Sequence, residues 1–317
     1  MIINKVYHLA DLHIRNLKRH KEYREVFTKF LKQVEEDDIQ DSVIYLGGDI
    51  AHAKTEMSPE LIQEISWFLT ECAKLREVVL ITGNHDCNLN NNYRLDVLTP
   101  IIENLNNSRI HYLRDTGVYP IHNLTFCVYS IMDNQKNWPD GKDVKGENTI
   151  CLFHGPVNDS QTDIGYTVSS NSFTSDMFDG FDMAMMGDIH KRQTIGGSHI
   201  AYCGSMIQQN HGETLDRHGY LLWDITQIKK KYKVQEFTVT RMDTLSKRKV
   251  GDFDNKLAIG NVRDVEFQNE LIKDYLERQY LADNSTIDKI QQINRDINTK
   301  LTDDDVTPNI QWIPQSF

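Results

Sequence analysis

The chain has 317 residues, of which 39% are hydrophobic and 26% are charged, and its formal net charge is −11. These proportions are typical of a globular protein, and the acidic balance argues against non-specific binding of nucleic acid by the surface as a whole. No apolar run approaches the roughly 18–20 residues that span a bilayer, and the first residues, MIINKVYHLAD, lack the layout of a signal peptide. We therefore expect a cytoplasmic protein without membrane contact, located in the host cytoplasm if its source is viral.

Short apolar strands alternate with amphipathic stretches through the first 200 residues. The runs VYHLA, SVIYLGG and EVVLITGN each end at a polar or glycine-containing turn, which is typical of buried strands. Further strand-like runs are NLTFCVYS, NTICLFHG and FDMAMMG.

Helical periodicity covers residues 20–37, 58–75 and 93–106, and Ser58-Pro59-Glu60 is a good start signal for the second helix. A β-α-β beginning followed by more strands predicts a layered α/β domain. In such a domain, ligand groups gather at the carboxyl ends of the strands.

The character of the chain changes after about residue 225. The run IKKKYKVQEFTVTRMD is strand-like with a lysine cluster, SKRK follows it, and the chain becomes polar and helical from about residue 264. We predict a main domain at 1–225, a smaller α+β capping region at 226–263 and a helical tail at 264–317. Five scattered cysteines without CxxC spacing are expected to be reduced and packed as small hydrophobes.

Side chains with oxygen or nitrogen donors for metal ions follow five of the predicted strands. They are Asp11, His13, Asp49, Asn84, His85, Asp86, His154, Asp188 and His190. Asp11 and His13 are two positions apart, as are Asp188 and His190, so in an extended chain each pair points to one side. Asp, His and Asn supply the donors that suit Mn²⁺, Fe²⁺, Zn²⁺ or Mg²⁺.

A single Asp-x-His pair or a lone Gly-Asp often marks only a turn, whereas GNHD crowds three polar groups directly after a buried strand. Seven candidate ligands among these residues are too many for one ion. They suit two ions that share one carboxylate, about 3.5–4 Å apart. Such a metal pair would also reverse the local field, so the acidic net charge does not exclude a phosphate substrate.

The motifs DLH, GD, GNHD, FHG and GDIH resemble the five signature motifs of the calcineurin-like metallophosphoesterases. The chain is most similar to the SbcD branch of DNA-repair nucleases, which includes phage recombination endonuclease subunits and the meiotic-recombination-eleven nucleases. His52 in GGDIAH and the segment IAYCGSMIQQNHGE carry the resemblance to this branch. The resemblance covers residues 1–225 and implies a layered β-sandwich flanked by helices.

The resemblance also implies a role for each matching position. Asp11, His13 and His190 would hold the first ion, Asn84, His154 and Asp188 the second, and Asp49 would bridge them. His85 would act as a general acid or transition-state stabiliser, and His52 would contact the nucleotide and help to place the scissile phosphate.

Asp188 departs from the family, which usually has histidine at this position. The added negative charge shifts the preference toward cations that favour oxygen ligands. We expect two divalent ions and favour Mn²⁺ over Mg²⁺ as their identity.

The implied function is that of a DNA phosphodiesterase, a 3′→5′ exonuclease and single-strand endonuclease in recombination and repair. The family forms homodimers through the region of residues 58–75 and 93–106 and works with an SbcC-type coiled-coil ATPase, which residues 264–317 would contact. The KKKYK and SKRK runs are either solvated faces or contacts to DNA phosphates.

Two alternatives remain open at this point. One is a metallophosphoesterase that hydrolyses another phosphoester, such as a phosphoprotein or a cyclic nucleotide. The other is a metal-poor scaffold that retains the fold for protein binding. His85 argues against the scaffold, because a non-catalytic protein has no need of a general acid.

Overall fold

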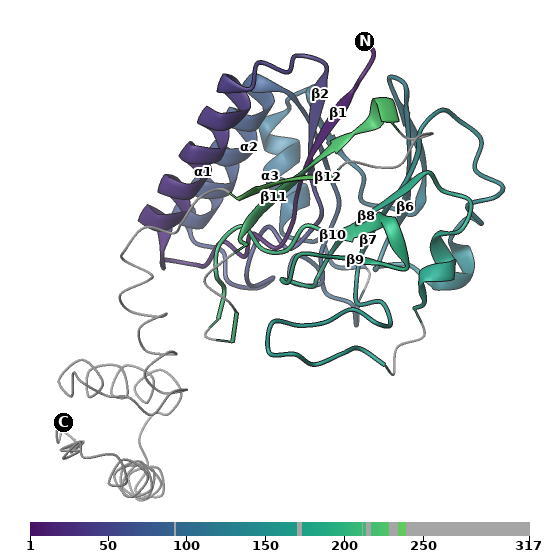
Figure 1. Ribbon diagram of the computed structural model, residues 1–317. Coiled ribbons are helices and arrows are strands. Elements are labelled where there is room, and N and C mark those ends of the chain that lie inside the picture. The colour runs from purple at the N-terminus through teal and green to yellow at the C-terminus, as the bar shows by residue number, and fades with distance from the viewer. Residues whose placement is uncertain (92, 170–172, 211, 214–216, 228–233, 239–317) are drawn as a thin grey trace, which may run out of the picture. The chain divides into compact units, whose positions relative to one another are not determined.

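The computed structural model describes residues 1–91, 93–169, 173–210, 212–213, 217–227 and 234–238 (Figure 1). Two six-stranded sheets lie within them. The first sheet contains β1 (Lys5–Leu9), β2 (Ser42–Leu46), β3 (Glu77–Leu80), β4 (Ile110–Tyr112), β11 (Gly219–Asp224) and β12 (Val234–Thr238). The second contains β5 (Gly117–Ile121), β6 (Leu124–Tyr129), β7 (Thr149–His154), β8 (Met183–Gly187), β9 (Gln193–Ile195) and β10 (Gly197–Tyr202).

The strand order brings the polar residues together. It is β12-β11-β1-β2-β3-β4 in the first sheet and β5-β6-β7-β8-β10-β9 in the second. Strands β1 to β4 are parallel, and so are β6, β7, β8 and β10. Parallel strands of one sheet end at the same edge, so the side chains that follow them share one region of space.

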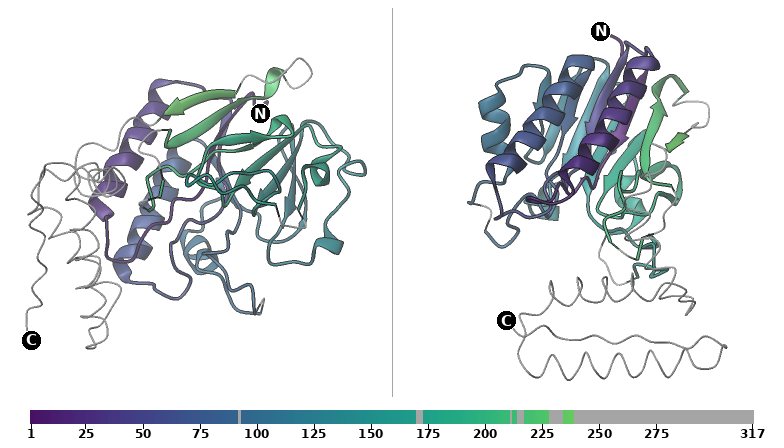
Figure 2. Two further views of the ribbon diagram at one scale, coloured as in Figure 1. Left: turned by 60° about the horizontal axis from the view of Figure 1, so that its bottom comes forward. Right: turned by 90° about the vertical axis from the view of Figure 1, so that its left-hand side faces the viewer.

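The two sheets pack face to face, and α-helices cover the outer face of the first sheet (Figures 1 and 2). The α-helices in the described residues are α1 (His20–Glu36), α2 (Pro59–Leu75) and α3 (Leu98–Leu105). Short 3₁₀ helices are η1 (Gln135–Asn137), η2 (Ser175–Phe178) and η3 (Ile225–Gln227). In the part of the chain that the structure describes, no helix is long and apolar enough to cross a membrane.

Alternate residues of a strand face different layers. Val6 of β1 belongs to the core between the sheets, together with Val79 of β3 and Leu152 of β7. Its neighbour Tyr7 points the other way and contacts Phe30 of α1, with ring centroids 6.2 Å apart. The sandwich therefore buries both faces of the first sheet, which explains its continuous apolar runs.

Local signals set the helix starts. Ser58 caps α2, because its hydroxyl accepts a hydrogen bond from the Leu61 N–H at 3.2 Å and Pro59 fills the first helical position. The predicted helix at 93–106 is shorter than expected and begins only at Leu98. The carboxylate of Asp96 accepts hydrogen bonds from the Leu98 and Thr99 N–H groups, which fixes the helix start at that point.

The predicted layered α/β fold, a sandwich flanked by helices, is confirmed for the described residues. All five cysteines are buried and free, as expected. Strand β12 comes from the region predicted as a capping region and pairs antiparallel with β11 in the first sheet. Residues 228–233 and 239–263 of this region and the tail at 264–317 lie outside the described residues, so the predicted boundaries stay predictions.

Candidate metal centre

Five strand ends converge at one edge of the sandwich. Loop hydrogen bonds join the ends of β1 and β2, with Asp11 N–H donating to the Gly48 carbonyl at 3.1 Å and His13 N–H to the Asp49 carbonyl at 2.9 Å. A side chain joins the two sheets, because His154 of β7 contacts the Gly47 carbonyl through Nδ1 at 2.7 Å. The structure thereby brings all seven predicted ligands into one region.

The backbone at this edge adopts an uncommon conformation. Asp11, His13, Asp49 and Asp188 have φ angles of 54°, 45°, 53° and 94°, in the left-handed region that few residues other than glycine adopt. Such residues cluster at functional sites, where the surrounding structure holds them in place. A Cβ atom at Gly83 would collide with the Asp49 carboxylate, so the glycine of GNHD permits a close approach.

The first group of side chains that meets at this edge contains Asp11, His13 and His190. Their ligand atoms all lie within 4.8 Å of one another. The Nε2 atoms of His13 and His190 are 3.0 Å apart, and His190 Nε2 is 3.9 Å from Asp11 Oδ1. These are the three residues that the family resemblance assigns to the first ion.

Asp49 lies between this group and the second one. Its Oδ2 is 3.4 Å from His13 Nε2, while its Oδ1 is 3.4 Å from His154 Nε2. On the far side, His154 Nε2 is 3.0 Å from Asn84 Oδ1 and 3.8 Å from Asp188 Oδ1. One carboxylate therefore faces both groups, which is the position that a bridging ligand requires.

The donor set fits divalent cations. Burial raises the pKa of Asp11 to about 6, although His190 and His154 lower it. Burial alone would also raise the pKa of Asp49, but His154 and His13 outweigh it and hold the pKa well below its usual range. Asp188 adds a third carboxylate, and burial raises its pKa as well. Bound cations would offset the cost of burying these charges together.

His85 and His52 lie beside the ligand groups. The two imidazole rings stack with centroids 5.5 Å apart, and His85 Nδ1 contacts the His52 carbonyl at 2.6 Å. The backbone N–H of His85 donates to Asp49 Oδ1 at 2.8 Å. Burial, Arg15 and His85 lower the pKa of His52 to about 4, so its imidazole is neutral at pH 7. Together with His13, the two form a third group of clustered ring nitrogens.

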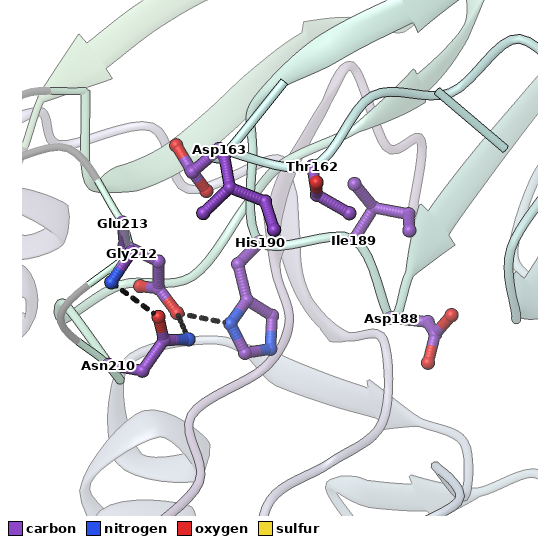
Figure 3. Close-up of a pocket in the computed structure, with 9 residues that line it drawn as sticks. Thr162, Asp163, Asp188, Ile189, His190, Asn210, Gly212 and Glu213 are labelled. Atoms are coloured by element: carbon purple, nitrogen blue, oxygen red, sulfur yellow. Dashed lines mark hydrogen bonds and ion pairs between the residues drawn. The ribbon is translucent and has the colours of Figure 1, made fainter. Parts of the chain in front are cut away.

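Glu213 is a site residue that the sequence reasoning missed. His190 Nδ1 donates to Glu213 Oε1 at 2.6 Å, and the amide of Asn210 donates to the same oxygen at 2.8 Å (Figure 3). Burial alone would lower the pKa of His190, but the hydrogen bond to Glu213 and the charge of Asp11 raise it to about 9. Glu213 thus fixes the imidazole so that Nε2 faces the ligand group.

Asp86 has a structural role that its place in GNHD did not reveal. It is fully buried, and its carboxylate accepts hydrogen bonds from the N–H groups of Gly83, Ala51 and Ile50 at 2.9, 2.8 and 3.3 Å. Asp86 therefore holds together the two loops that carry Asp49 and Asn84. Burial and the charge of Asp49 raise its pKa to about 7.

Residues 4–192 match the family described as calcineurin-like phosphoesterase, and the chain belongs to this family. This places it among the metal-dependent phosphoester hydrolases, in agreement with the clustered metal-ligating side chains. The chain is 35% identical over 341 residues to uncharacterized protein R555 of Acanthamoeba polyphaga mimivirus. That match covers 99% of this chain and 24% of the relative, so the chain spans about a quarter of the relative's length.

Two solved structures show more distant similarity. TT1561 of Thermus thermophilus is 11% identical with a TM-score of 0.43, and the match covers 75% of this chain and all of that one. The Pseudomonas putida nuclease MPE is 14% identical with a TM-score of 0.32, and the match covers 71% of this chain and 85% of that one.

Proposed function

We propose that this protein is a two-metal DNA phosphodiesterase, with 3′→5′ exonuclease and single-strand endonuclease activity. The observation that carries the proposal is the position of Asp49, whose Oδ2 faces His13 and whose Oδ1 faces His154. The sequence features of the SbcD branch, His52 and the segment that contains Glu213, lie at the same site and support DNA as the substrate.

Each of the predicted site residues would have a defined role in this reaction. Asp11, His13 and His190 would hold one ion, Asn84, His154 and Asp188 the other, and Asp49 both. When bound, two divalent ions lower the pKa of a water molecule and neutralise phosphate oxygens. His85 keeps its Nδ1 on the His52 carbonyl, which orients the ring and leaves Nε2 to donate a proton to the departing oxygen.

The test is a His85→Ala variant of the full chain. Because His85 assists the leaving group without holding an ion, cleavage of linear DNA with Mn²⁺ should fall about 10²–10⁴-fold. Metal stoichiometry, measured by calorimetry, should stay at two. His122→Ala is the matched control and should cleave DNA normally. His122 lies in the turn between β5 and β6 and contacts Glu77 at the start of β3, away from the predicted ligands.

Other outcomes separate the alternatives. Hydrolysis of p-nitrophenyl phosphate without any cleavage of DNA would overturn the proposal in favour of a phosphatase. No hydrolysis of either substrate and no bound metal would favour a scaffold. Near-normal DNA cleavage by His85→Ala would remove His85 from the mechanism, and loss of an ion would make it a ligand.

We also propose that the chain forms a homodimer and works with an SbcC-type coiled-coil ATPase. Support for the dimer comes from the loop before α3, where Tyr93 is fully exposed and Leu95 is 70% exposed. Phe68 and Leu98, which the sequence places in the same region, are buried in the domain itself. We propose that the exposed side chains of Tyr93 and Leu95 contribute to the contact between the two copies.

A further inference from the structure

A cavity, which we call the aromatic pocket, lies beside the predicted ligands of the second ion. Its volume is about 390 Å³. One wall consists of metal-centre residues and the other is mainly apolar. Its lining residues include Asn84, His154 and Asp188 on the first wall and Leu89, Ile131, Trp138, Phe153 and Phe173 on the second. The roles assigned above to the metal centre do not use this second wall.

Trp138 is held in a fixed position in the pocket. Its ring stacks on Tyr129 with centroids 4.8 Å apart and planes 8° from parallel. The indole N–H donates to the Ser130 carbonyl at 3.2 Å. Phe173 lies 5.6 Å from Trp138 and Phe153 5.4 Å, measured between ring centroids. The aromatic wall is therefore formed before any ligand binds, which lowers the entropic cost of binding.

The chemistry of the lining points to a flat, uncharged and partly polar group. Aromatic side chains bind nucleobases by stacking, whatever the base. Asp133 and Gln135 add polar side chains to the lining. The carboxylate of Asp133 would repel a second phosphate, whereas it can accept hydrogen bonds from the amino groups of a base. Pockets of roughly 300–1,000 Å³ are usual for small organic ligands, so this one has room for a base.

The location of the pocket relates the base to the reacting phosphate. Asn84 and Asp188 line the pocket and also belong to the predicted ligand set of the second ion. A phosphate at the metal centre would therefore place its own nucleoside at the mouth of the pocket. A base that enters it exchanges contacts with neighbouring bases for contacts with the aromatic side chains.

We infer that the aromatic pocket binds one unpaired nucleobase of the nucleotide whose phosphate is cleaved. The inference rests on the proposed function, and it adds a specificity site to that function. It predicts that single strands and frayed ends are better substrates than paired ends, because only an unpaired base can enter without the cost of breaking a base pair.

The first arm of the test uses the unaltered full chain with Mn²⁺. Single-stranded oligonucleotides would carry a normal 3′ end, or would lack the base on the 3′-terminal or on the next nucleotide. One of the two abasic substrates should show kcat/KM lowered by about 10-fold or more, since stacking of a base on an aromatic side chain has effects of this size. Equal kcat/KM for all three substrates would overturn the inference.

The second arm uses Trp138→Ala. This variant should lose about 10-fold or more on the normal substrate and little on the affected abasic one. Trp138→Phe, which keeps an aromatic ring, should retain most of the activity. Tyr119→Ala is the matched control, since Tyr119 lies on the edge strand β5, outside the pocket lining, and its hydroxyl donates to the Asp115 carbonyl at 2.9 Å. An equal loss on all substrates in Trp138→Ala, with Trp138→Phe equally impaired, would show a structural role only.

The outcomes distinguish the two proposals. If the unaltered protein cleaves no DNA, the proposed function fails and the inference fails with it. If it cleaves DNA but is indifferent to the missing base, only the inference is overturned.

Discussion

Asp188 introduces a third carboxylate into a space that already contains Asp11 and Asp49. The Asp188 N–H donates to both oxygens of Asp11, at 3.0 and 3.2 Å, so the backbone at this position also orients a predicted ligand of the other ion. A substitution of Asp188 by another residue keeps that backbone donor and changes only the side chain. Its effect therefore reports on the carboxylate itself.

We predict that Asp188→Ala loses the second ion and most of the activity. Asp188→His should retain activity with Mn²⁺ and lose part of any activity with Mg²⁺, because an imidazole is a poorer ligand for a hard cation than a carboxylate. The measurement is metal stoichiometry together with DNA cleavage in each metal. Full activity and two bound ions in Asp188→Ala would show that Asp188 is only a turn residue.

Glu213 offers a second test at the same scale. Because it orients the His190 imidazole, Glu213→Ala should weaken the affinity for the first ion by about 10–100-fold. Glu213→Gln should have a smaller effect, since an amide oxygen can still accept the hydrogen bond from Nδ1. Isothermal titration with Mn²⁺ measures both variants. Unchanged affinity in Glu213→Ala would mean that packing alone fixes the imidazole.

The carboxylates at strand ends could be predicted from sequence, whereas Glu213, which orients the His190 imidazole, could not. Asp11, Asp49 and Asp188 each follow a buried strand within three residues, so a carboxylate just after an apolar run identifies them. Glu213 has no such neighbour, and its partner His190 is 23 positions away. Its role depends on a tertiary contact, which residue spacing does not encode.

At the scale of elements, most of the buried strands were predictable, whereas the edge strand β5 was not. Strand β7 is buried at every residue, and its sequence is apolar from Ile150 to Phe153. Strand β5 at the edge of the second sheet contains Pro120 and alternates between half-buried and exposed residues. Proline is tolerated there because an edge strand leaves part of its backbone unpaired. The pattern of β5 was therefore too weak to predict a strand.

The start of α3 carries a prediction about stability. Asp96 is buried, and Arg114 Nε donates to its carboxylate at 2.8 Å. Burial alone would raise the pKa of Asp96, but the hydrogen bonds from Arg114 and Thr99 lower it below its ordinary value of 3.8. Asp96→Asn should therefore lower the free energy of unfolding at pH 7 by about 1–3 kcal/mol.

The sign of the pH dependence follows from the lowered pKa. The contribution of Asp96 is fully present above its ordinary pKa and is lost as the pH falls through the lower pKa of the folded state. Urea unfolding at pH 7 and at several acidic pH values would measure it, and the difference between the two proteins should shrink in acid. Asp115→Asn is the control, because Asp115 also contacts Arg114 but is exposed. A constant difference at all pH values would contradict this account.

At the scale of the whole molecule, the chain divides into Met1–Arg241 and Met242–Phe317. All nine predicted site residues belong to the first unit. The sequence separated a catalytic part from a polar tail by composition, since apolar strands are confined to the former. It could not place the junction within ten residues, because β12 continues the first sheet beyond the change in composition.

Deletion of residues 264–317 tests the proposal that this segment contacts the ATPase and is not needed for catalysis. Mn²⁺-dependent cleavage of short single strands should persist, because every site residue remains. ATP-stimulated cleavage and co-purification with a coiled-coil ATPase should disappear. Light scattering should still report a dimer, since Tyr93 and Leu95 remain. A truncated protein that aggregates or loses all activity would show that the tail belongs to the catalytic fold.

The metal centre draws its ligands from both sheets, with Asp49 following β2 and His154 ending β7. A bound ion pair would thus act as a non-covalent cross-link at one edge of the sandwich. Because the unfolded chain lacks this arrangement, free metal at about 100 times its Kd would stabilise the folded state by about 2.7 kcal/mol. The melting temperature of the protein then becomes a measure of how much divalent cation its surroundings contain.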